Sequence, residues 1–584
     1  MIYQSFVDIV NRYPDKVALL YKKQGNYQRL RYRELKVQVD AVSLNLQKLG
    51  IGRDDAVGIF SYNRPEWVIA DLATLKLGGI VVPIYHSAST AYIKYIIEDA
   101  SLKLLFVENI NLLEIMPGRF NPVVLMEPAE ERKDLLDFKQ LLIKSDFAPI
   151  DDRSIRGDDI ATVVYTSGTT GEPKGVILSH NNIISNALCG RDRFNFCSKD
   201  RVLSYLPLSH MFERTCGYYA ILFAGGTIAY AQNPATVIKD MQKIHPTIIL
   251  VVPRVLEKTY QIVKNKIEKG SPLKRKLVLW TIKNLNKYIN LRYTKQPIPL
   301  WLNLKSKLSD NFIGSKFRKI GGKRLKLIVS GGAPLNFEMA KLLHIFGFNI
   351  VEGYGLTEAS PVVSSNTVKN NRLGSVGKSF EEVEVKIGKD DEILVRGPNV
   401  MKGYLNKPEE TAKIIDKDGW LHTGDQGRFD EAGNLIITGR IKELIITSYG
   451  KKIAPLPIEA KICRSQYIEQ VILLGESKKC LVALIVLNQE EIEEYARENN
   501  IAFETYSELL KCPAIIRFVG QEIEDLTADL APYEKVKAFV LLDEGFTIEN
   551  GGLTPTLKLR RLEIAKKYES VIERMYKGLQ RYED

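Results

Sequence analysis

Residues Thr162 to His180 read TVVYTSGTTGEPKGVILSH. Residues 159–166, DIATVVYT, overlap the start of this stretch; they are mostly apolar and β-branched and predict a buried strand. The residues after Lys174 begin as a second strand and turn helical at Asn181. The Gly-, Ser- and Thr-rich middle therefore lies between two buried elements, whereas a linker joins domains and is flanked by polar sequence.

The loop from Thr166 to Gly175 has the composition of a phosphate-binding loop. Glycines let backbone N–H groups converge on an anion, the hydroxyls add donors, and Lys174 adds a compact positive charge. The spacing is not that of the Walker loop, because Lys174 follows Gly171 by three residues and Gly175 stands directly after it, where the Walker loop has Ser or Thr. On this stretch alone phosphate binding is favoured, and an ordinary turn remains the alternative.

Length and composition predict a soluble globular protein of at least two domains rather than a disordered chain. The 584 residues are too many for one core, and the chain is 45% hydrophobic and 26% charged. The six cysteines show no CxxC pair, so we expect a reducing, cytoplasmic compartment without disulfides or zinc. The first 20 residues do not have the pattern of a signal peptide.

One uncharged stretch, Thr215 to Ile238, has to be weighed as a membrane span. Gly225-Gly226 and Asn233-Pro234 interrupt it, and a spanning helix needs about 20 mostly apolar residues. A buried helix, a glycine turn and a buried strand are therefore the favoured interpretation.

The net charge of +12 is concentrated in one segment. Lys258 to Arg324 holds 18 of the 82 Lys and Arg residues but two of the 70 acidic ones, so the rest of the chain is slightly acidic. Apolar residues recur there at helical spacing, with Trp280 and Trp301 among the lysines. This pattern is typical of a helical face on an anionic membrane, and a solvated charged face is the alternative. No nucleic-acid-binding module accompanies the charge, so we expect no nucleic acid partner.

The stretch LKLIVSGGAPL, a predicted helix from Asn336 to Phe346 and the strand NIVEGYG form a βαβ unit and imply a parallel sheet. Gly331-Gly332 and Gly353 to Gly355 follow the two strands, where ligands of such sheets bind. Further on, LHTGDQGRF and LIITGR predict two strands around a DEAGN turn. Near the C-terminus, VILLG, LVALIVLN and VKAFVLLD predict strands of a separate α+β lobe.

Six sequence blocks in this order resemble the adenylate-forming enzymes, which include acyl-CoA synthetases, luciferases and adenylation domains. They are TSGTTGEPKG, LPLSHMFERT, SGGAPL, EGYGLTEASP, HTGDQGRF with LIITGRIKELI, and LTPTLKLRR. The resemblance implies a large multi-sheet α/β domain over residues 1–441, which carries the basic insertion. It also implies a small mobile α+β domain over residues 442–584, with a hinge at Lys442.

The resemblance also assigns an ATP site. Its expected residues are Thr166, Ser167, Gly168, Thr169, Thr170, Gly171, Lys174, Gly331, Gly332, Ala333, Pro334, Glu352, Gly353, Tyr354, Gly355, Leu356, Thr357, Asp425, Arg440 and Lys558. The Tyr354 ring is suited to packing on the base, and the Asp425 carboxylate can accept from both ribose hydroxyls. Glu358 and Thr166 would share Mg²⁺, because a carboxylate beside phosphates needs an intervening cation.

The catalytic expectations concern Lys558, Lys174, His210 and Glu358. Lys558 matches the family's adenylation lysine, which would bridge the substrate carboxylate and the α-phosphate. His210 would lie at the acyl end of the site, with a packed core histidine as the alternative. Gly450 in SYGKKIAPLPIE is expected on the path of coenzyme A.

The blocks LTPTLKLRR, GKKIAPLPIE and SHMFER are most similar to the long-chain fatty acyl group, so the resemblance implies a long-chain fatty acid:CoA ligase that uses ATP, Mg²⁺ and coenzyme A. One alternative is a fatty acyl-AMP ligase that passes the acyl group to a carrier protein. Another is a membrane-associated fatty acid binder without catalysis. The basic segment 258–324 would place the enzyme peripherally on the inner face of the cell membrane.

Overall fold

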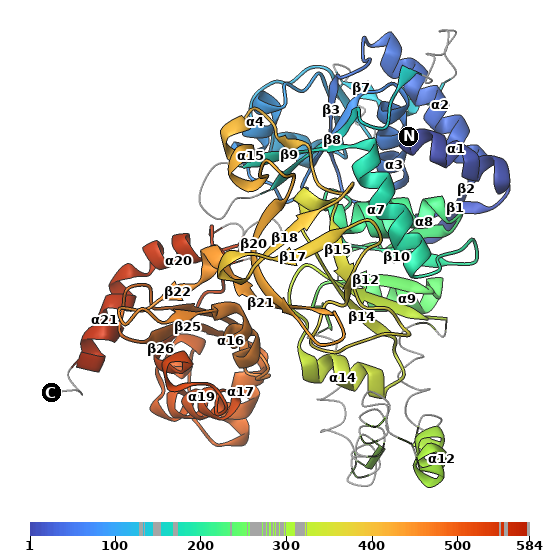
Figure 1. The fold of residues 1–584 in the computed structure, drawn as a ribbon. Helices are drawn as coiled ribbons and strands as arrows, with labels where there is room; N and C mark the ends of the chain where they lie inside the picture. Colours follow the sequence, from blue (N-terminus) through green and yellow to red (C-terminus); the bar gives the residue numbers. More distant parts are fainter. Residues whose placement is uncertain are drawn as a thin grey trace.

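Figure 1 shows a large N-terminal region and a smaller C-terminal lobe, joined through the strands that follow residue 400. The computed structural model describes the chain except residues 128–131, 133–134, 144–153, 167–172, 234–235, 254, most of 257–323, 548–549, 554–558 and 581–584. Residues Ser167 to Gly171 and Lys558 therefore lie outside the described residues.

The stretch from Thr162 to His180 belongs to the first large sheet. In spatial order its described strands are β19 (Gly403–Tyr404), β9 (Lys174–Ser179), β8 (Ile160–Thr166), β4 (Ile80–Ile84), β3 (Ala56–Phe60), β5 (Leu104–Val107), β6 (Val123–Leu125) and β7 (Leu136–Asp137). The inner residues of β8 are buried, as its apolar composition predicts. β9 pairs antiparallel with β8, so Thr166 faces Lys174 across the ladder at the open end of the loop.

The second large sheet contains the predicted βαβ unit. Its described strands are β16 (Lys378–Ser379), β15 (Val362–Ser365), β14 (Ile350–Gly355), β13 (Leu327–Ser330), β12 (Ile248–Val251), β10 (Arg201–Ser204), β11 (Thr227–Tyr230), β1 (Val17–Lys23) and β2 (Asn26–Arg31). β13 and β14 pair in parallel and are connected by α14 (Phe337–Ile345). Gly331-Gly332 directly follow β13, as predicted, whereas Gly353 to Gly355 are the last residues of β14 itself and pair with β15.

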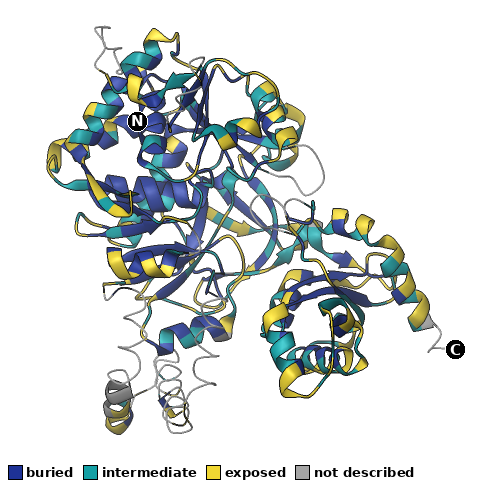
Figure 2. Cartoon of the chain, turned by 180° about the vertical axis from the view of Figure 1, so that it is seen from behind, coloured by how far each residue is buried: buried dark blue, intermediate teal, exposed yellow. Residues whose placement is uncertain are grey.

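One hydrophobic core joins the two large sheets. It contains Val57 and Val164 of the first sheet, Val202 and Ile248 of the second, and helix α3 (Pro65–Lys76), most of which is buried. Figure 2 shows this interior as continuous buried ribbon. The other described helices of this region are α1 (Ile2–Arg12), α2 (Tyr32–Lys48), α4 (Thr90–Asp99), α5 (Ile110–Glu114), α6 (Phe138–Leu141), α7 (His180–Arg193), α8 (Ala220–Phe223), α9 (Val237–Ile244), α12 (Leu300–Ser309) and α15 (Pro408–Ile414).

The uncharged stretch after Thr215 is part of this core. A π-helix (Phe212–Tyr219) leads directly into α8, and β11 follows the glycine turn. The helix therefore begins earlier than expected and has π rather than α geometry over its first eight residues. None of the helices in the described residues combines the length and apolar character that a membrane crossing requires.

A third sheet carries the predicted hairpin. Its described strands are β17 (Glu384–Ile387), β18 (Glu392–Arg396), β20 (Leu421–Phe429) and β21 (Leu435–Arg440). The DEAGN turn is closed by the Asp430 carboxylate, which accepts hydrogen bonds from the backbone N–H groups of Ala432 and Asn434. The antiparallel register places Asp425 opposite Arg440.

The C-terminal lobe has its own sheet and its own core, which includes Ile458, Leu473 and Ile485. The three predicted strands are β24 (Ile468–Leu474), β25 (Leu481–Leu487) and β26 (Val536–Leu542). The remaining described elements are β22 (Ile445–Ile446), β23 (Lys452–Ile453), α16 (Pro455–Ile462), α17 (Gln489–Glu498), α18 (Tyr506–Lys511), α19 (Pro513–Leu526), α20 (Arg561–Lys567) and α21 (Glu569–Gln580). The α+β lobe predicted from the sequence is thus present.

Candidate functional site

A cavity of about 1630 Å³ lies where the two large sheets, the hairpin and the C-terminal lobe meet. Lys174, Glu358 and Asp425 line it, although each comes from a different sheet or turn. Leu559 and Arg560 of the C-terminal lobe line the same cavity. The structure therefore brings together most of the distant blocks that the sequence singles out.

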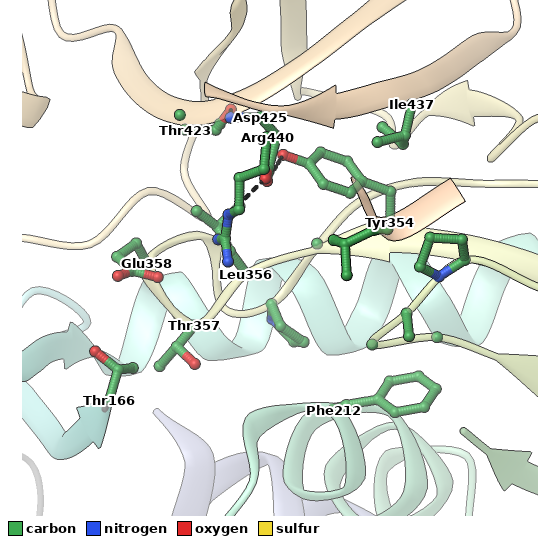
Figure 3. A pocket seen from close by; sticks show the side chains of 18 of the residues that line it. Thr166, Phe212, Tyr354, Leu356, Thr357, Glu358, Thr423, Asp425, Ile437 and Arg440 are labelled. Atoms are coloured by element: carbon green, nitrogen blue, oxygen red, sulfur yellow. Dashed lines mark hydrogen bonds and ion pairs between the residues drawn. The ribbon is translucent and has the colours of Figure 1, made fainter. Parts of the chain in front are cut away.

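Asp425 is held by two partners that use different carboxylate oxygens. Arg440 Nε lies 2.9 Å from Asp425 Oδ1, and the Tyr354 hydroxyl donates to Asp425 Oδ2 over 2.7 Å. Figure 3 shows both side chains converging on Asp425. Burial, followed by the charge of Asp425, raises the pKa of Tyr354 well above its ordinary value, so the hydroxyl remains a donor. The sequence did not predict the bond from Tyr354.

The turn after β13 is exposed in the cavity and is anchored from β14. The Glu352 carboxylate accepts a hydrogen bond of 2.9 Å from the Leu335 backbone N–H, and burial raises the pKa of Glu352 to about 7. Gly332 has φ +84°, which favours glycine. Ala333, Pro334, Gly331 and Gly353 also line the cavity, beside the Tyr354 ring. A flat ring could lie along this surface.

Gly355, the last residue of β14, packs closely against the chain that follows the strand. A Cβ at Gly355 would lie 2.0 Å from the Pro361 carbonyl oxygen, so no larger residue fits. Leu356 and Thr357 come next and also line the cavity. The close approach of the backbone leads directly into the turn that carries Glu358.

Glu358 and Thr166 lie towards the other end of the view in Figure 3. The Tyr404 hydroxyl donates to Glu358 over 2.9 Å and orients the carboxylate. A carboxylate and a hydroxyl are the hard oxygen donors that Mg²⁺ accepts beside phosphates and water. The described residues contain no cluster of three or more His, Cys, Asp or Glu suited to a metal ion. A cation here would thus depend on substrate oxygens.

Lys174 opens β9 and points into the same cavity. Its ammonium group lies 2.5 Å from Glu410 Oε2 on α15 and 5.1 Å from the centre of the Tyr404 ring. Neither Glu410 nor Tyr404 was singled out from the sequence. The positive charge expected at the phosphate loop is thus already paired within the protein.

His210 lies just before the π-helix, and its Nδ1 accepts a hydrogen bond of 3.1 Å from the Phe212 backbone N–H. In a neutral ring this bond assigns the proton to Nε2. The cavity continues beyond His210 between α7 and the π-helix, where its lining is mostly apolar. These residues are Ala187, Gly190, Phe194, Phe196, Phe212, Cys216 and Ala220. An apolar chain would fit this extension.

Arg214 is a residue of the π-helix, and its side chain connects this helix to neighbouring elements. The sequence did not indicate this structural role. Its buried guanidinium donates to the Thr162 hydroxyl over 2.8 Å and pairs with the buried carboxylate of Asp71 on α3. Tyr218 and Tyr219 donate to the second oxygen of Asp71. This network ties the π-helix to β8, the strand that ends at the phosphate loop.

The C-terminal lobe presents one of its two expected functional segments to the cavity. Leu559 and Arg560 directly follow Lys558, which itself lies outside the described residues. Lys442 is in the short 3₁₀-helix Ile441–Glu443 between the hairpin and β22. Gly450 is in an exposed turn with φ +71° and is not among the described residues that line the cavity. In this arrangement Leu559 and Arg560 adjoin the cavity, whereas Gly450 does not.

Comparisons with known families match residues 6–405 to a family described as AMP-binding enzyme and residues 442–580 to its C-terminal domain. One similar relative is Long chain acyl-CoA synthetase 7, peroxisomal, from Arabidopsis thaliana, which is 30% identical over 98% of this chain and 86% of its own length. Another is Long-chain-fatty-acid–CoA ligase 5 from Mus musculus, which is 31% identical over 96% of this chain and 86% of its own.

Solved structures share the fold. The adenylation domain of a carboxylate reductase from Mycobacterium chelonae has a TM-score of 0.78 at 20% identity, covering 99% of this chain and 91% of that one. The O-succinylbenzoate Coenzyme A Synthetase from Bacillus subtilis in complex with AMP has a TM-score of 0.68 at 22% identity, covering 95% and 97%. The expectation of an adenylate-forming fold is therefore confirmed, and the chain belongs to the AMP-binding enzyme family.

Proposed function

We propose that this protein is a long-chain fatty acid:CoA ligase that forms acyl-CoA, AMP and pyrophosphate from a fatty acid, ATP and coenzyme A. The observation that carries the proposal is one cavity with two unlike ends. Lys174, Glu358 and the Asp425–Arg440 pair line its polar part, and apolar residues beyond His210 line its extension. The relatives named as long-chain acyl-CoA synthetases support the choice of substrate.

The first half-reaction joins the fatty carboxylate to the α-phosphorus of ATP, with pyrophosphate as the leaving group. Asp425 accepts from the ribose hydroxyls, while Lys174 and the loop Ser167 to Gly171 offset the polyphosphate charge. Lys558 bridges the carboxylate and the α-phosphate, which is consistent with its neighbour Leu559 at the cavity. Mg²⁺ would be held by Glu358 and the Thr166 hydroxyl and would supply positive charge between that carboxylate and the phosphates.

The second half-reaction is attack of the thiol of coenzyme A on the acyl carbon, with AMP as the leaving group. Adenylation is chemically necessary because a free carboxylate has no adequate leaving group. The Gly450 loop lies outside the cavity in the present arrangement. Rotation of the C-terminal lobe about Lys442 would exchange the Lys558 segment for this loop, with the change absorbed by a few dihedral angles.

A peripheral position on an anionic membrane is proposed for the basic segment 258–324, in a cytoplasmic enzyme. Most of this segment lies outside the described residues. The support comes from Trp301, which is 49% exposed and lies beneath the ammonium groups of Lys287 and Lys305. An exposed indole among lysines suits the interface between lipid headgroups and water. Co-sedimentation with vesicles that does not change with their anionic lipid content would contradict this position.

The function is tested by thioester formation with a panel of saturated fatty acids from short to very long, with ATP and free coenzyme A. We expect acyl-CoA and AMP to form in equal amounts, with the highest kcat/KM for long chains. Accumulation of acyl-AMP without thioester would instead favour an acyl-AMP ligase that uses a carrier protein. Absence of fatty acid-dependent ATP–pyrophosphate exchange would leave a fatty acid binder.

A further inference from the structure

Helix α15 (Pro408–Ile414) and the residue before it carry charged side chains that line the cavity and that no sequence motif indicates. Lys407, Glu410 and Lys413 line the cavity together with Thr166 and Lys174. Residues Gly403–Tyr404 just before this helix pair with β9, so α15 is connected to the strand that begins at Lys174. The helix is therefore held next to Lys174 and the start of β9.

Glu410 bridges two ammonium groups. Its Oε2 binds Lys174 at 2.5 Å, and its Oε1 binds Lys413, three residues further along the same helix. These two hydrogen bonds, with that from Lys174 the stronger influence, lower the pKa of Glu410 to about 2. The carboxylate is therefore ionised at any physiological pH, and it separates two lysines that would otherwise repel each other.

A carboxylate between two lysines, at the edge of a cavity, occupies the position that an oxyanion of similar size would take. Phosphate carries more charge than a carboxylate and offers more acceptor oxygens, so it can replace Glu410 as the partner of both ammonium groups. The side chains are accessible to such an exchange, since Lys174 is 26% exposed, Glu410 35% and Lys413 66%.

We propose that Glu410 is an exchangeable counter-ion for Lys174, and that Lys174 and Lys413 together bind the terminal phosphates of ATP and the pyrophosphate that leaves. This inference rests on the proposed function, because it assigns the groups that hold the leaving group of adenylation. Phosphates that enter the site release Glu410 from both lysines. When pyrophosphate departs, Glu410 returns to them and keeps the two cations neutralised.

The test is direct binding of magnesium pyrophosphate to the full-length protein by calorimetry, without fatty acid or nucleotide. Exposed ion pairs of this kind are worth little, so changes of about two- to fivefold in Kd are expected. Glu410→Gln removes the competing anion and tightens binding. Lys413→Gln weakens binding, and Lys413→Arg restores it because the charge is kept, which a purely structural role for the side chain would not explain.

Matched controls lie one and four residues away. Glu409→Gln and Lys417→Gln alter exposed residues that do not line the cavity, and we expect both to bind pyrophosphate like the wild type. The inference is overturned if Glu410→Gln weakens binding or leaves it unchanged, or if Lys413→Gln binds as the wild type does. Failure of the wild type to bind pyrophosphate would overturn it as well.

ATP–pyrophosphate exchange stimulated by a long-chain fatty acid separates this inference from the proposed function. If the wild type catalyses exchange but the variants bind as their controls do, the role of α15 is wrong and the ligase function stands. If the binding shifts occur without any exchange, the anion site stands and the ligase function is wrong.

Discussion

Two carboxylate–cation pairs line the same cavity, and they are built differently. Asp425 and Arg440 face each other across two registered strands, and Tyr354 fixes the second carboxylate oxygen. Glu410 and Lys174 come from a short helix and a strand end, and both side chains are more exposed than Asp425. A pair fixed by a hairpin can recognise one constant group, whereas a pair between accessible side chains can be opened by a stronger anion.

The largest expected effect is at the fixed pair. Asp425→Ala should lower kcat/KM for ATP by about 100-fold or more, because the variant loses both hydrogen bonds that the carboxylate would accept from the ribose hydroxyls, each worth about 1.5–3 kcal/mol as a bond to a charged group. The variant also leaves Arg440 without its carboxylate. Steady-state kinetics against ATP measure the change, with the exposed Asp418→Ala as the control. An unchanged KM and kcat for ATP would show that Asp425 does not bind the nucleotide.

A somewhat smaller loss of activity is expected when the exchangeable pair, Lys174 and Glu410, is disrupted. Lys174→Gln should lower kcat/KM for ATP by about 10- to 100-fold, since one of several charges that stabilise the transferring phosphates is removed. The KM for the fatty acid should remain close to the wild-type value. Fatty acid-dependent ATP–pyrophosphate exchange gives the readout. If the KM for the fatty acid rose instead, Lys174 would belong to the acyl end of the cavity.

Tyr354→Phe tests how much nucleotide binding at the Asp425–Arg440 pair depends on the hydrogen bond from the Tyr354 hydroxyl. The ring remains beside the turn after β13 but the hydrogen bond to Asp425 is lost, so we expect a ~2- to 12-fold rise in the KM for ATP, in line with about 0.5–1.5 kcal/mol for the net worth of a typical hydrogen bond. Asp425 and Arg440 should still pair. An equal loss in Tyr354→Phe and Asp425→Ala would mean that the hydroxyl, rather than the carboxylate, meets the ribose.

The smallest expected effect is a difference between the two pairs in how strongly ligand binding depends on salt concentration. Raising NaCl from about 50 to about 300 mM should weaken pyrophosphate binding several-fold and adenosine binding less than twofold, because salt screens the attraction between lysines and a highly charged anion, whereas adenosine carries no charge and would bind Asp425 through hydrogen bonds. Calorimetry with each ligand measures this. Similar salt dependence for both ligands would remove the contrast between the fixed and the exchangeable pair.

Much of the fold follows from local pattern. The stretches LKLIVSGG and NIVEGYG predicted the parallel strands β13 and β14, since buried β-branched runs that end in glycine are typical of strands that precede a ligand turn. The hairpin around DEAGN and the three strands of the C-terminal lobe were predicted for the same reason. Periodicity did not predict the π-helix, whose geometry coincides with the buried Arg214–Asp71 network.

The site was only partly predictable because its partners are far apart in the sequence. Lys174 and Glu410 are 236 residues apart, and Tyr354 and Asp425 are 71 apart. Glu410 occurs in an ordinary charged helix, KPEETAK, which has no local feature that distinguishes it from a solvated surface. Such pairs are created by sheet topology, which places β19 beside β9, and no local motif encodes them.

The proposed ligase function requires a carboxylate oxygen to attack the α-phosphorus of ATP in this cavity. Incubation with ATP, coenzyme A and palmitate labelled with ¹⁸O in both carboxylate oxygens tests it most directly, by mass spectrometry of the nucleotide and phosphate products. We expect AMP that carries one ¹⁸O atom and pyrophosphate that carries none. Label in inorganic phosphate, with ADP as the nucleotide product, would show attack at the terminal phosphorus and would contradict it.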